Sequence, residues 1–196
     1  MYNGIIWLLK RRFNDLFERY TGMHIMNSIP RGSTKFAKEH FKDKKINVAE
    51  IGVYKAYNSI NILKELNVKS FTSIDPYISD GEYQEEINQW LDKAKQYAFR
   101  NIMKYKSNTK LTFIYKKAEE AHKDLDDDFD FIYIDGDHSE KEVYKDISNY
   151  WGKIKEGGIL AGHDFNLEGV SRAVYKFAND NGLLVYNLGV DWWYIK

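Results

Sequence analysis

The chain has 196 residues, of which 43% are hydrophobic and 30% charged, values typical of one globular domain with a substantial core. The 29 basic and 29 acidic residues cancel to a formal net charge of +0, so composition gives no reason to expect nucleic acid as a partner. Cysteine is absent, which excludes disulfides, thiolate metal sites and cysteine nucleophiles and is compatible with a cytoplasmic protein.

Near the amino end, the apolar run from Ile5 to Leu9 is too short to span a bilayer, and stable membrane insertion is not expected. Continued through Tyr20, apolar residues recur at helical spacing, which predicts an amphipathic helix. We expect residues 1–45 to form a helical arm that packs on its own domain or joins a second copy in a homodimer. Contact with a membrane surface through Lys10 to Arg12 is the alternative.

From residue 46 onward, strand and helix patterns alternate. Strands are expected over residues 46–52, 69–76, 110–118, 129–135, 157–165, 183–189 and 191–196. Helices are expected over residues 58–67, 84–105, 118–125, 139–154 and 168–181. This alternation predicts an α/β domain over residues 46–196, with a doubly wound, mostly parallel sheet and a terminal strand pair turning at Gly189. In the long helix, Ile87, Trp90, Leu91, Ala94 and Ala98 share one face.

Polar residues occur at the ends of successive predicted strands. They are Glu50, Asp75, Ala118-Glu119, Asp135 and His163-Asp164. In an open parallel sheet, ligands bind outside the carboxyl ends of the strands, near the point where strand order reverses. We therefore expect these residues to converge on one crevice.

The loop after the first predicted strand holds one glycine, Gly52, and matches neither G-x-G-x-x-G nor a P-loop. A pyrophosphate cradle is therefore not expected. Asp75, at the end of the next strand, could accept hydrogen bonds from both hydroxyls of a ribose. Glu50 could contact a cationic amino acid or a water network.

In these strand-end residues and in this loop, the chain resembles the class I S-adenosylmethionine-dependent methyltransferases. The resemblance covers about residues 46–196. It is most similar to metal-assisted O-methyltransferases that act on small molecules, such as the catechol and macrolide-sugar enzymes. The resemblance rests on EIGVYKAYNS (50–59), SIDPY (73–77), YIDGDHS (133–139) and GGILAGHDF (157–165). It implies a seven-stranded Rossmann-like sheet with an antiparallel terminal strand. It also implies that S-adenosylmethionine binds at Glu50, Gly52, Tyr54, Asn58, Asp75, Ala118, Glu119 and Asp135.

The same resemblance implies a divalent metal ion, such as Mg²⁺ or Mn²⁺, on Asp135, His163 and Asp164, with His138 as general base. The implied reaction is methyl transfer to a hydroxyl of a small molecule, a sugar or a phenol. Asp135 and His138 would then hold and deprotonate the acceptor. Histidine at 163, where catechol enzymes have a carboxylate, favours Mn²⁺, Fe²⁺ or Zn²⁺ over Mg²⁺, or no metal. Ala56 replaces a common glycine, which is tolerable if its φ is negative.

The same residues also suit other interpretations. Asp137 suits a helix cap or a partner for His138, and His163-Asp164 suits a loop wall that holds no metal. The fold also suits a nucleotide-dependent oxidoreductase, which the single loop glycine disfavours, or a non-catalytic module that binds S-adenosylmethionine or a nucleotide. Nucleic acid methylation is disfavoured by the neutral charge and by the absence of an Asn/Asp-Pro-Pro-aromatic motif.

Overall fold

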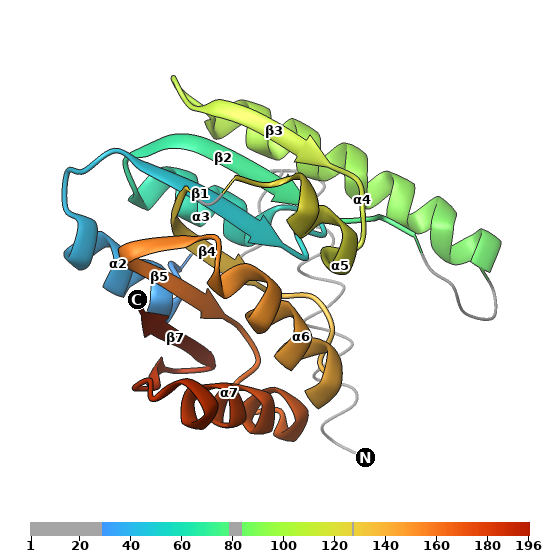
Figure 1. The fold of residues 1–196 in the computed structure, drawn as a ribbon. Helices are drawn as coiled ribbons and strands as arrows, with labels where there is room; N and C mark the ends of the chain where they lie inside the picture. Colours follow the sequence, from blue (N-terminus) through green and yellow to red (C-terminus); the bar gives the residue numbers. More distant parts are fainter. Residues whose placement is uncertain (1–28, 79–83, 127) are drawn as a thin grey trace, which may run out of the picture.

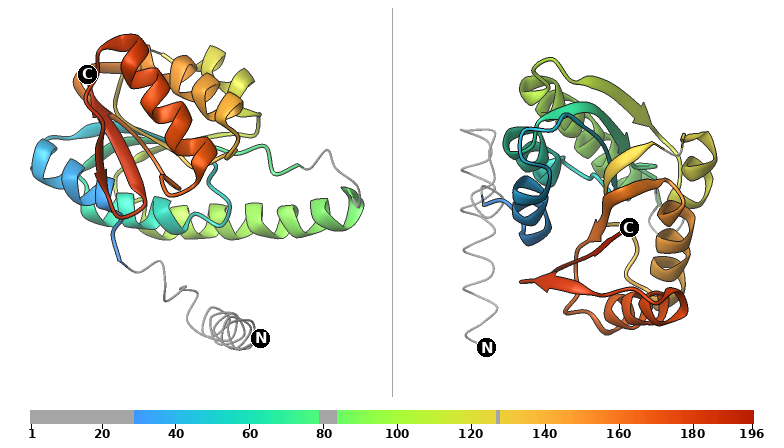
Figure 2. Two further views of the ribbon diagram at one scale, coloured as in Figure 1. Left: turned by 90° about the horizontal axis from the view of Figure 1, so that it is seen from below. Right: turned by 60° about the vertical axis from the view of Figure 1, so that its left-hand side comes forward.

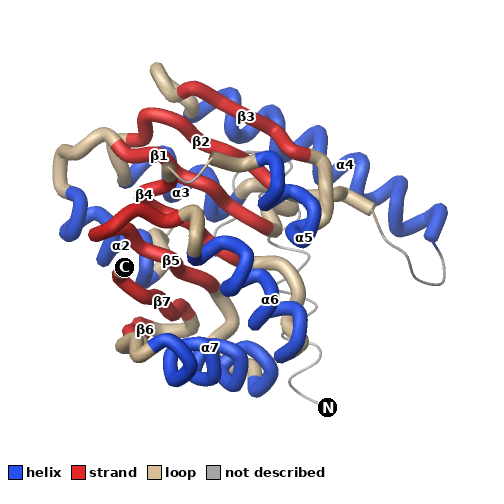
Figure 3. Tube along the Cα trace, in the orientation of Figure 1, coloured by secondary structure: helices blue, strands red, loops and turns tan. Residues whose placement is uncertain are grey.

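The computed structural model describes residues 29–78, 84–126 and 128–196. Its strands form one seven-stranded sheet in the order β3-β2-β1-β4-β5-β7-β6 (Figures 1 and 3). The strands are β1 (Ile46–Ile51), β2 (Val68–Ile74), β3 (Lys110–Ile114), β4 (Phe129–Ile134), β5 (Ile154–Gly162), β6 (Tyr186–Leu188) and β7 (Asp191–Ile195). The helices are α2 (Gly32–Phe41), α3 (Tyr57–Glu65), α4 (Gln84–Tyr105), α5 (Ala118–Ala121), η2 (His122–Asp124), α6 (Glu140–Trp151) and α7 (Glu168–Asn181).

Strands β1 to β5 are parallel, whereas β7 pairs antiparallel with both β5 and β6. The expected doubly wound, mostly parallel sheet with an antiparallel end is therefore confirmed. The expected terminal strand 183–189 is shorter in the structure, because only Tyr186 to Leu188 pair with β7.

Side chains alternate between the two faces of the sheet and build two separate cores. On β4, Ile132 and Ile134 face α6 and α7, while Phe131 and Tyr133 belong to the core shared with α2, α3 and α4. Figure 2 shows these two helical layers on opposite sides of the strands. Trp192 and Trp193 fall in different cores, and both are buried, at 1% and 5% exposure.

The helix α4 has the expected bounds, but only part of its expected face is covered. Ala94 and Ala98 are buried, whereas Ile87 and Trp90 are 37% and 50% exposed. Among the described side chains, full burial therefore begins at Ala94, nearly three turns into the helix, because the amino-terminal turns extend past the sheet (Figure 1).

Residues on the amino side of position 45 contribute to the core of the sheet domain. Ala37 and Phe41 of α2 pack in the same cluster as Trp193, and Ser33 contacts Asp191 of β7. The domain boundary at residue 45 remains a prediction. The expected amphipathic helix ending near Tyr20 and the homodimer through the arm lie outside the described residues. Among the helices that are described, none is long and apolar enough to cross a membrane.

The sheet reverses its strand order at β1 and β4, and there the backbone of Gly52 approaches the backbone of Asp135. Gly52 has a φ of +80°, and a Cβ atom on it would lie 1.9 Å from the Asp135 carbonyl oxygen. Both residues continue the ladder, since Gly52 N donates to Ile74 O and Asp135 N to Ile51 O. Glycine is required here for space as well as for conformation.

Gly52→Ala is therefore expected to lower the free energy of unfolding by about 3 kcal/mol or more, through steric overlap added to backbone strain. Gly157→Ala is the matched control, because Gly157 also has a positive φ, +74°, but a Cβ atom on it would meet no heavy atom of the described residues within 4 Å. The control is expected to lose only about 1 kcal/mol. Urea unfolding measures both values, and equal losses in the two variants would contradict the close approach.

Candidate functional site

An open cavity of ≈ 630 Å³ lies at the carboxyl ends of β1, β2 and β4. It is lined by six of the eight residues expected to bind a cofactor: Gly52, Tyr54, Asp75, Ala118, Glu119 and Asp135. The other two, Glu50 and Asn58, are buried next to this edge, at 1% and 4% exposure. The structure thus brings together residues from four separate segments of the chain.

Asp75 is held in place by the loop after β1. Its Oδ2 accepts a hydrogen bond from the Tyr54 amide (2.8 Å), and its Oδ1 accepts one from the Tyr77 amide (2.9 Å). Burial raises the pKa of Asp75, although these backbone bonds favour the charged form and oppose the shift. Each carboxylate oxygen has a second lone pair, so Asp75 can still accept hydrogen bonds from a ligand in the cavity.

Glu50 is the most deeply buried acid of the predicted set. Its carboxylate accepts hydrogen bonds from Asn58 Nδ2 (3.0 Å) and from the Ser59 hydroxyl of α3. Burial nevertheless raises the pKa of Glu50 to about 7. Asn58 Oδ1 is buried and has no hydrogen-bond partner among the described residues. This arrangement leaves one acceptor atom available beside a carboxylate.

The loop between β1 and α3 is strained at two residues. Tyr54 has a φ of 50°, and Ala56, at the amino end of α3, has a φ of 62°. The condition under which alanine at position 56 is tolerable, a negative φ, is therefore not met. The loop must turn sharply so that the Tyr54 amide reaches Asp75, and a left-handed backbone at an L-residue costs about 1–2 kcal/mol.

The same cavity is lined by a carboxylate that sequence reasoning missed. Asp146 of α6 lines the cavity although its residue is only 6% exposed, and burial raises its pKa to about 7. Glu119, which was expected there, pairs with Lys145, and this hydrogen bond lowers the pKa of Glu119. Helical spacing places residue 146 on the buried face of α6, but nothing in the sequence shows that this face borders a cavity.

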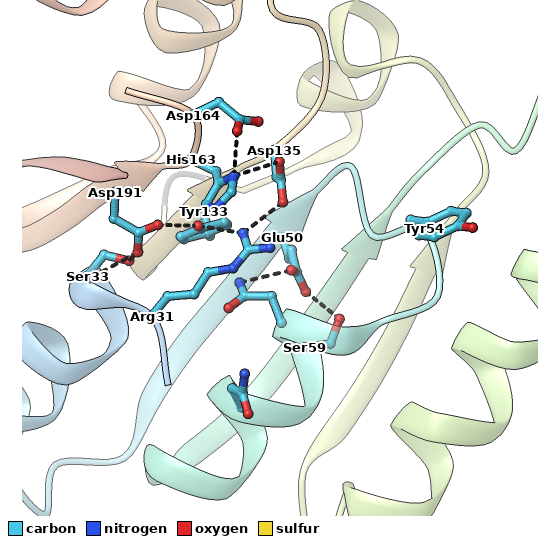
Figure 4. A network of polar contacts seen from close by, with 12 residues as sticks. Arg31, Ser33, Glu50, Tyr54, Ser59, Tyr133, Asp135, His163, Asp164 and Asp191 are labelled. Atoms are coloured by element: carbon cyan, nitrogen blue, oxygen red, sulfur yellow. Dashed lines mark hydrogen bonds and ion pairs between the residues drawn. The ribbon is translucent and has the colours of Figure 1, made fainter. Parts of the chain in front are cut away.

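His138 and His163 lie on the other side of Asp135, around a small adjoining cavity. His138 Nε2 is 2.9 Å from Asp164 Oδ2, and His163 Nδ1 is 3.0 Å from Asp164 Oδ1. His163 Nδ1 is also 3.8 Å from Asp135 Oδ1 (Figure 4). The four predicted catalytic and metal-binding residues therefore converge.

The Asp137 carboxylate interacts mainly with its own turn, where hydrogen bonds from Ser139 and, to a smaller extent, His138 lower the pKa of Asp137. Its Oδ1 accepts a hydrogen bond from the Ser139 amide (2.6 Å) and stabilises the turn that leads into α6. The capping interpretation of Asp137 is thus closer to the structure, although Ser139 is the residue at the helix cap position. The carboxylate that orients His138 is instead Asp164, from the next strand end.

Asp135, His138 and Asp164 each offer one metal-ligating atom, and these atoms lie within 4.8 Å of one another. One imidazole nitrogen and two carboxylate oxygens are ligands that suit Mn²⁺, Fe²⁺ or Zn²⁺. The donor set therefore fits a divalent cation in its chemistry, with His163 close to two of the three residues.

Arg31 also reaches this site, and sequence reasoning missed it. Arg31 Nη1 donates to Asp135 Oδ2 (2.7 Å) and to the Tyr133 hydroxyl (2.6 Å). Burial alone would lower the pKa of Arg31, but Tyr133 and Asp135 outweigh burial and raise it. The residue comes from the turn-rich stretch before α2, where the sequence pattern gives no signal for a contact with position 135.

Known protein families include one that matches most of this chain. Residues 49–165 match a family model described as "Methyltransferase domain". No curated protein matches the chain significantly.

Several solved structures share the fold. A methyltransferase from Podospora anserina with bound S-adenosylhomocysteine superposes with a TM-score of 0.60 at 16% identity, covering 96% of this chain and 85% of that one. An O-methyltransferase from Bacillus cereus in complex with S-adenosylhomocysteine gives 0.59 at 14% identity, with 95% and 90% covered. A precorrin-6y C5,15-methyltransferase from Geobacter metallireducens gives 0.58 at 16% identity, with 83% and 88% covered.

The burial of Glu50 generates a pH-dependent prediction. The pKa of Glu50 rises from 4.5 to about 7 on folding. Protonated Glu50 therefore contributes its full stabilisation to the fold below pH 4.5, and this contribution is lost as pH rises through 7. Relative to Glu50→Gln, the wild-type chain is therefore expected to lose about 3 kcal/mol of stability across this range. Urea unfolding at a series of pH values measures the difference.

Glu39→Gln, on an exposed position of α2, controls for the loss of one charge. Parallel stability curves for wild type and Glu50→Gln would contradict the burial argument.

Proposed function

Because the chain belongs to the methyltransferase-domain family, we propose that it transfers a methyl group from S-adenosylmethionine to a hydroxyl of a small molecule, a sugar or a phenol. The observation that carries this proposal is the placement of Asp75 and His138 on opposite sides of Asp135, at the carboxyl edge of the sheet. One side suits a nucleoside, and the other suits a proton acceptor. The acceptor lies between them in this proposal.

The cofactor would occupy the larger cavity. Gly52, which has no side chain, lets the methionine part approach the backbone, and Asp75 would accept hydrogen bonds from the ribose hydroxyls. Glu50 suits the ammonium group of the methionine part, and so does Asn58 Oδ1, which has no hydrogen-bond partner within the described part of the chain. Ala118 and Glu119 would contact the adenine, as the family resemblance implies.

His138 would remove the proton from the acceptor hydroxyl. Because Nε2 faces the Asp164 carboxylate at 2.9 Å, that carboxylate favours the tautomer with hydrogen on Nε2. Nδ1 is then the nitrogen that can accept a proton. Asp164 orients the ring and stabilises the positive charge that forms, while the acceptor oxygen attacks the methyl carbon of the sulfonium and the thioether leaves.

A divalent cation is a second part of the proposal, which the family resemblance implies for Asp135, His163 and Asp164. When bound, it would orient the acceptor and lower the pKa of its hydroxyl. The proposal further includes a cytoplasmic protein that acts without nucleic acid. It also retains the boundary at residue 45 and a homodimer through the arm.

The cofactor assignment predicts that the chain binds S-adenosylhomocysteine and not NADH in isothermal titration calorimetry. Asp75→Asn is expected to weaken S-adenosylhomocysteine binding by roughly ten- to a hundredfold, because two hydrogen bonds to the ribose are lost or weakened. Asp126→Asn, at an exposed position outside the cavity, is the matched control. Binding of NADH in place of S-adenosylhomocysteine would favour the oxidoreductase interpretation.

The catalytic assignment predicts that His138→Ala lowers kcat by roughly a hundredfold or more, because the acceptor hydroxyl loses its base. The assay uses a panel of phenols and sugars and measures S-adenosylhomocysteine release, with and without Mn²⁺. Retained turnover in the His138→Ala variant would remove His138 from the mechanism. Tight cofactor binding without any methyl transfer would favour the non-catalytic module.

A further inference from the structure

Arg31 places a fixed positive charge directly on the central carboxylate of the proposed acceptor site. Figure 4 shows its guanidinium between Tyr133, Asp135 and Glu50. One of its nitrogen atoms, Nη1, makes both short contacts, to Asp135 Oδ2 and to the Tyr133 hydroxyl. The side chain is 21% exposed and that of Asp135 is 20% exposed, so water only partly screens this ion pair.

The position of Arg31 is fixed by a buried network that begins two residues later. The Ser33 amide and hydroxyl both donate to Asp191 Oδ2, at 3.0 Å and 2.5 Å, and the Tyr133 hydroxyl donates to Asp191 Oδ1 at 2.9 Å. Asp191 is only 1% exposed. Because the same tyrosine hydroxyl accepts from Arg31, the network joins the start of α2, β4 and β7 to the guanidinium.

This ion pair bears directly on any metal ion at the cluster. Asp135 is a member of both the expected ligand set and the group of three residues whose donor atoms lie close together. Its Oδ2 already accepts a hydrogen bond from Arg31 Nη1, and its Oδ1 faces His163 Nδ1. A divalent cation on Asp135 would stand within a few ångströms of a guanidinium, which remains charged at any pH that the protein experiences.

We propose that Arg31 is a built-in cation of this site that competes with divalent metal ions for Asp135, so that the wild-type chain binds them weakly. The guanidinium neutralises Asp135 where a metal ion otherwise would. Removing it opens the Asp135–His138–Asp164 cluster to a metal ion. The inference rests on the proposed function only in naming this cluster as the acceptor site, since the competition itself follows from the contacts.

The test is a titration of each variant with Mn²⁺ alone. Binding is measured by calorimetry and by the decrease in the electron paramagnetic resonance signal of the free ion. Arg31→Ala and Arg31→Gln are expected to bind Mn²⁺ roughly tenfold or more tightly than wild type, because one repelling charge is removed. Arg100→Ala removes a charge from the exposed surface of α4 and is expected to bind as wild type does. The double variant Arg31→Gln with Asp135→Asn is expected to lose the gained affinity.

Arg31→Gln keeps hydrogen-bonding capacity and guards against a folding defect in the alanine variant, which thermal unfolding detects. Equal Mn²⁺ affinity in folded wild-type and variant chains overturns the proposal. Weaker Mn²⁺ affinity in the Arg31 variants than in wild type also overturns it, and so does a complete absence of Mn²⁺ binding in the variants. A tight site in Arg31→Gln that survives Asp135→Asn also overturns it.

Titration of the same samples with S-adenosylhomocysteine separates this inference from the proposed function. Retained S-adenosylhomocysteine binding with no change in Mn²⁺ affinity would reject the role of Arg31 alone. If wild type does not bind S-adenosylhomocysteine but the variants bind Mn²⁺ more tightly than wild type, the cofactor proposal is rejected. The competition between Arg31 and the metal ion then still stands.

Discussion

The parallel ladder pairs Ile51 with both Ile74 and Ile134, and it pairs Ile134 with Gly162. The residues that follow these four, namely Gly52, Asp75, Asp135 and His163, therefore lie in one row at the carboxyl edge of the sheet. Their own amides extend the ladder, as in the bond from His163 N to Ile134 O (3.1 Å). A shift of one residue in any pair would turn the strand's side chains to the other face, so the site depends on this register.

Grouping acids at one edge is unfavourable unless their charge is balanced. Asp75 is stabilised by backbone amides, Glu50 by Asn58 and Ser59, and Asp191 by Ser33 and Tyr133. Asp135 is instead balanced by a full positive charge, the guanidinium of Arg31. Hydrogen bonds from neutral donors leave a carboxylate available to a cationic ligand, whereas an ion pair partly satisfies it. In the proposed function, this difference separates the cofactor side of the crevice from its acceptor side.

The sequence was sufficient for the sheet and for most of the crevice, because strand patterns locate strand ends and parallel pairing brings those ends together. Gly52, Asp75 and Asp135 were found in this way. Contacts between segments that share no pattern were not predictable. The pairing of His138 with Asp164 depends on how two loops turn, and the φ of Ala56 depends on the amide that must reach Asp75. Arg31 lies 104 positions before its partner, in a stretch without periodicity.

The two oxygen atoms of Asp135 face different parts of the protein, which constrains how an acceptor can approach. Oδ2 is engaged by Arg31, from the side of α2, and Oδ1 faces His163. A hydroxyl that binds Asp135 without displacing Arg31 therefore meets less competition at Oδ1 than at Oδ2, on the side where Asp164 contacts His138. The residues before α2 thus direct the acceptor of the proposed reaction toward its base, although none of them removes a proton. Positioning of this kind lowers the barrier by fixing the orientation of the attacking oxygen before the chemical step begins.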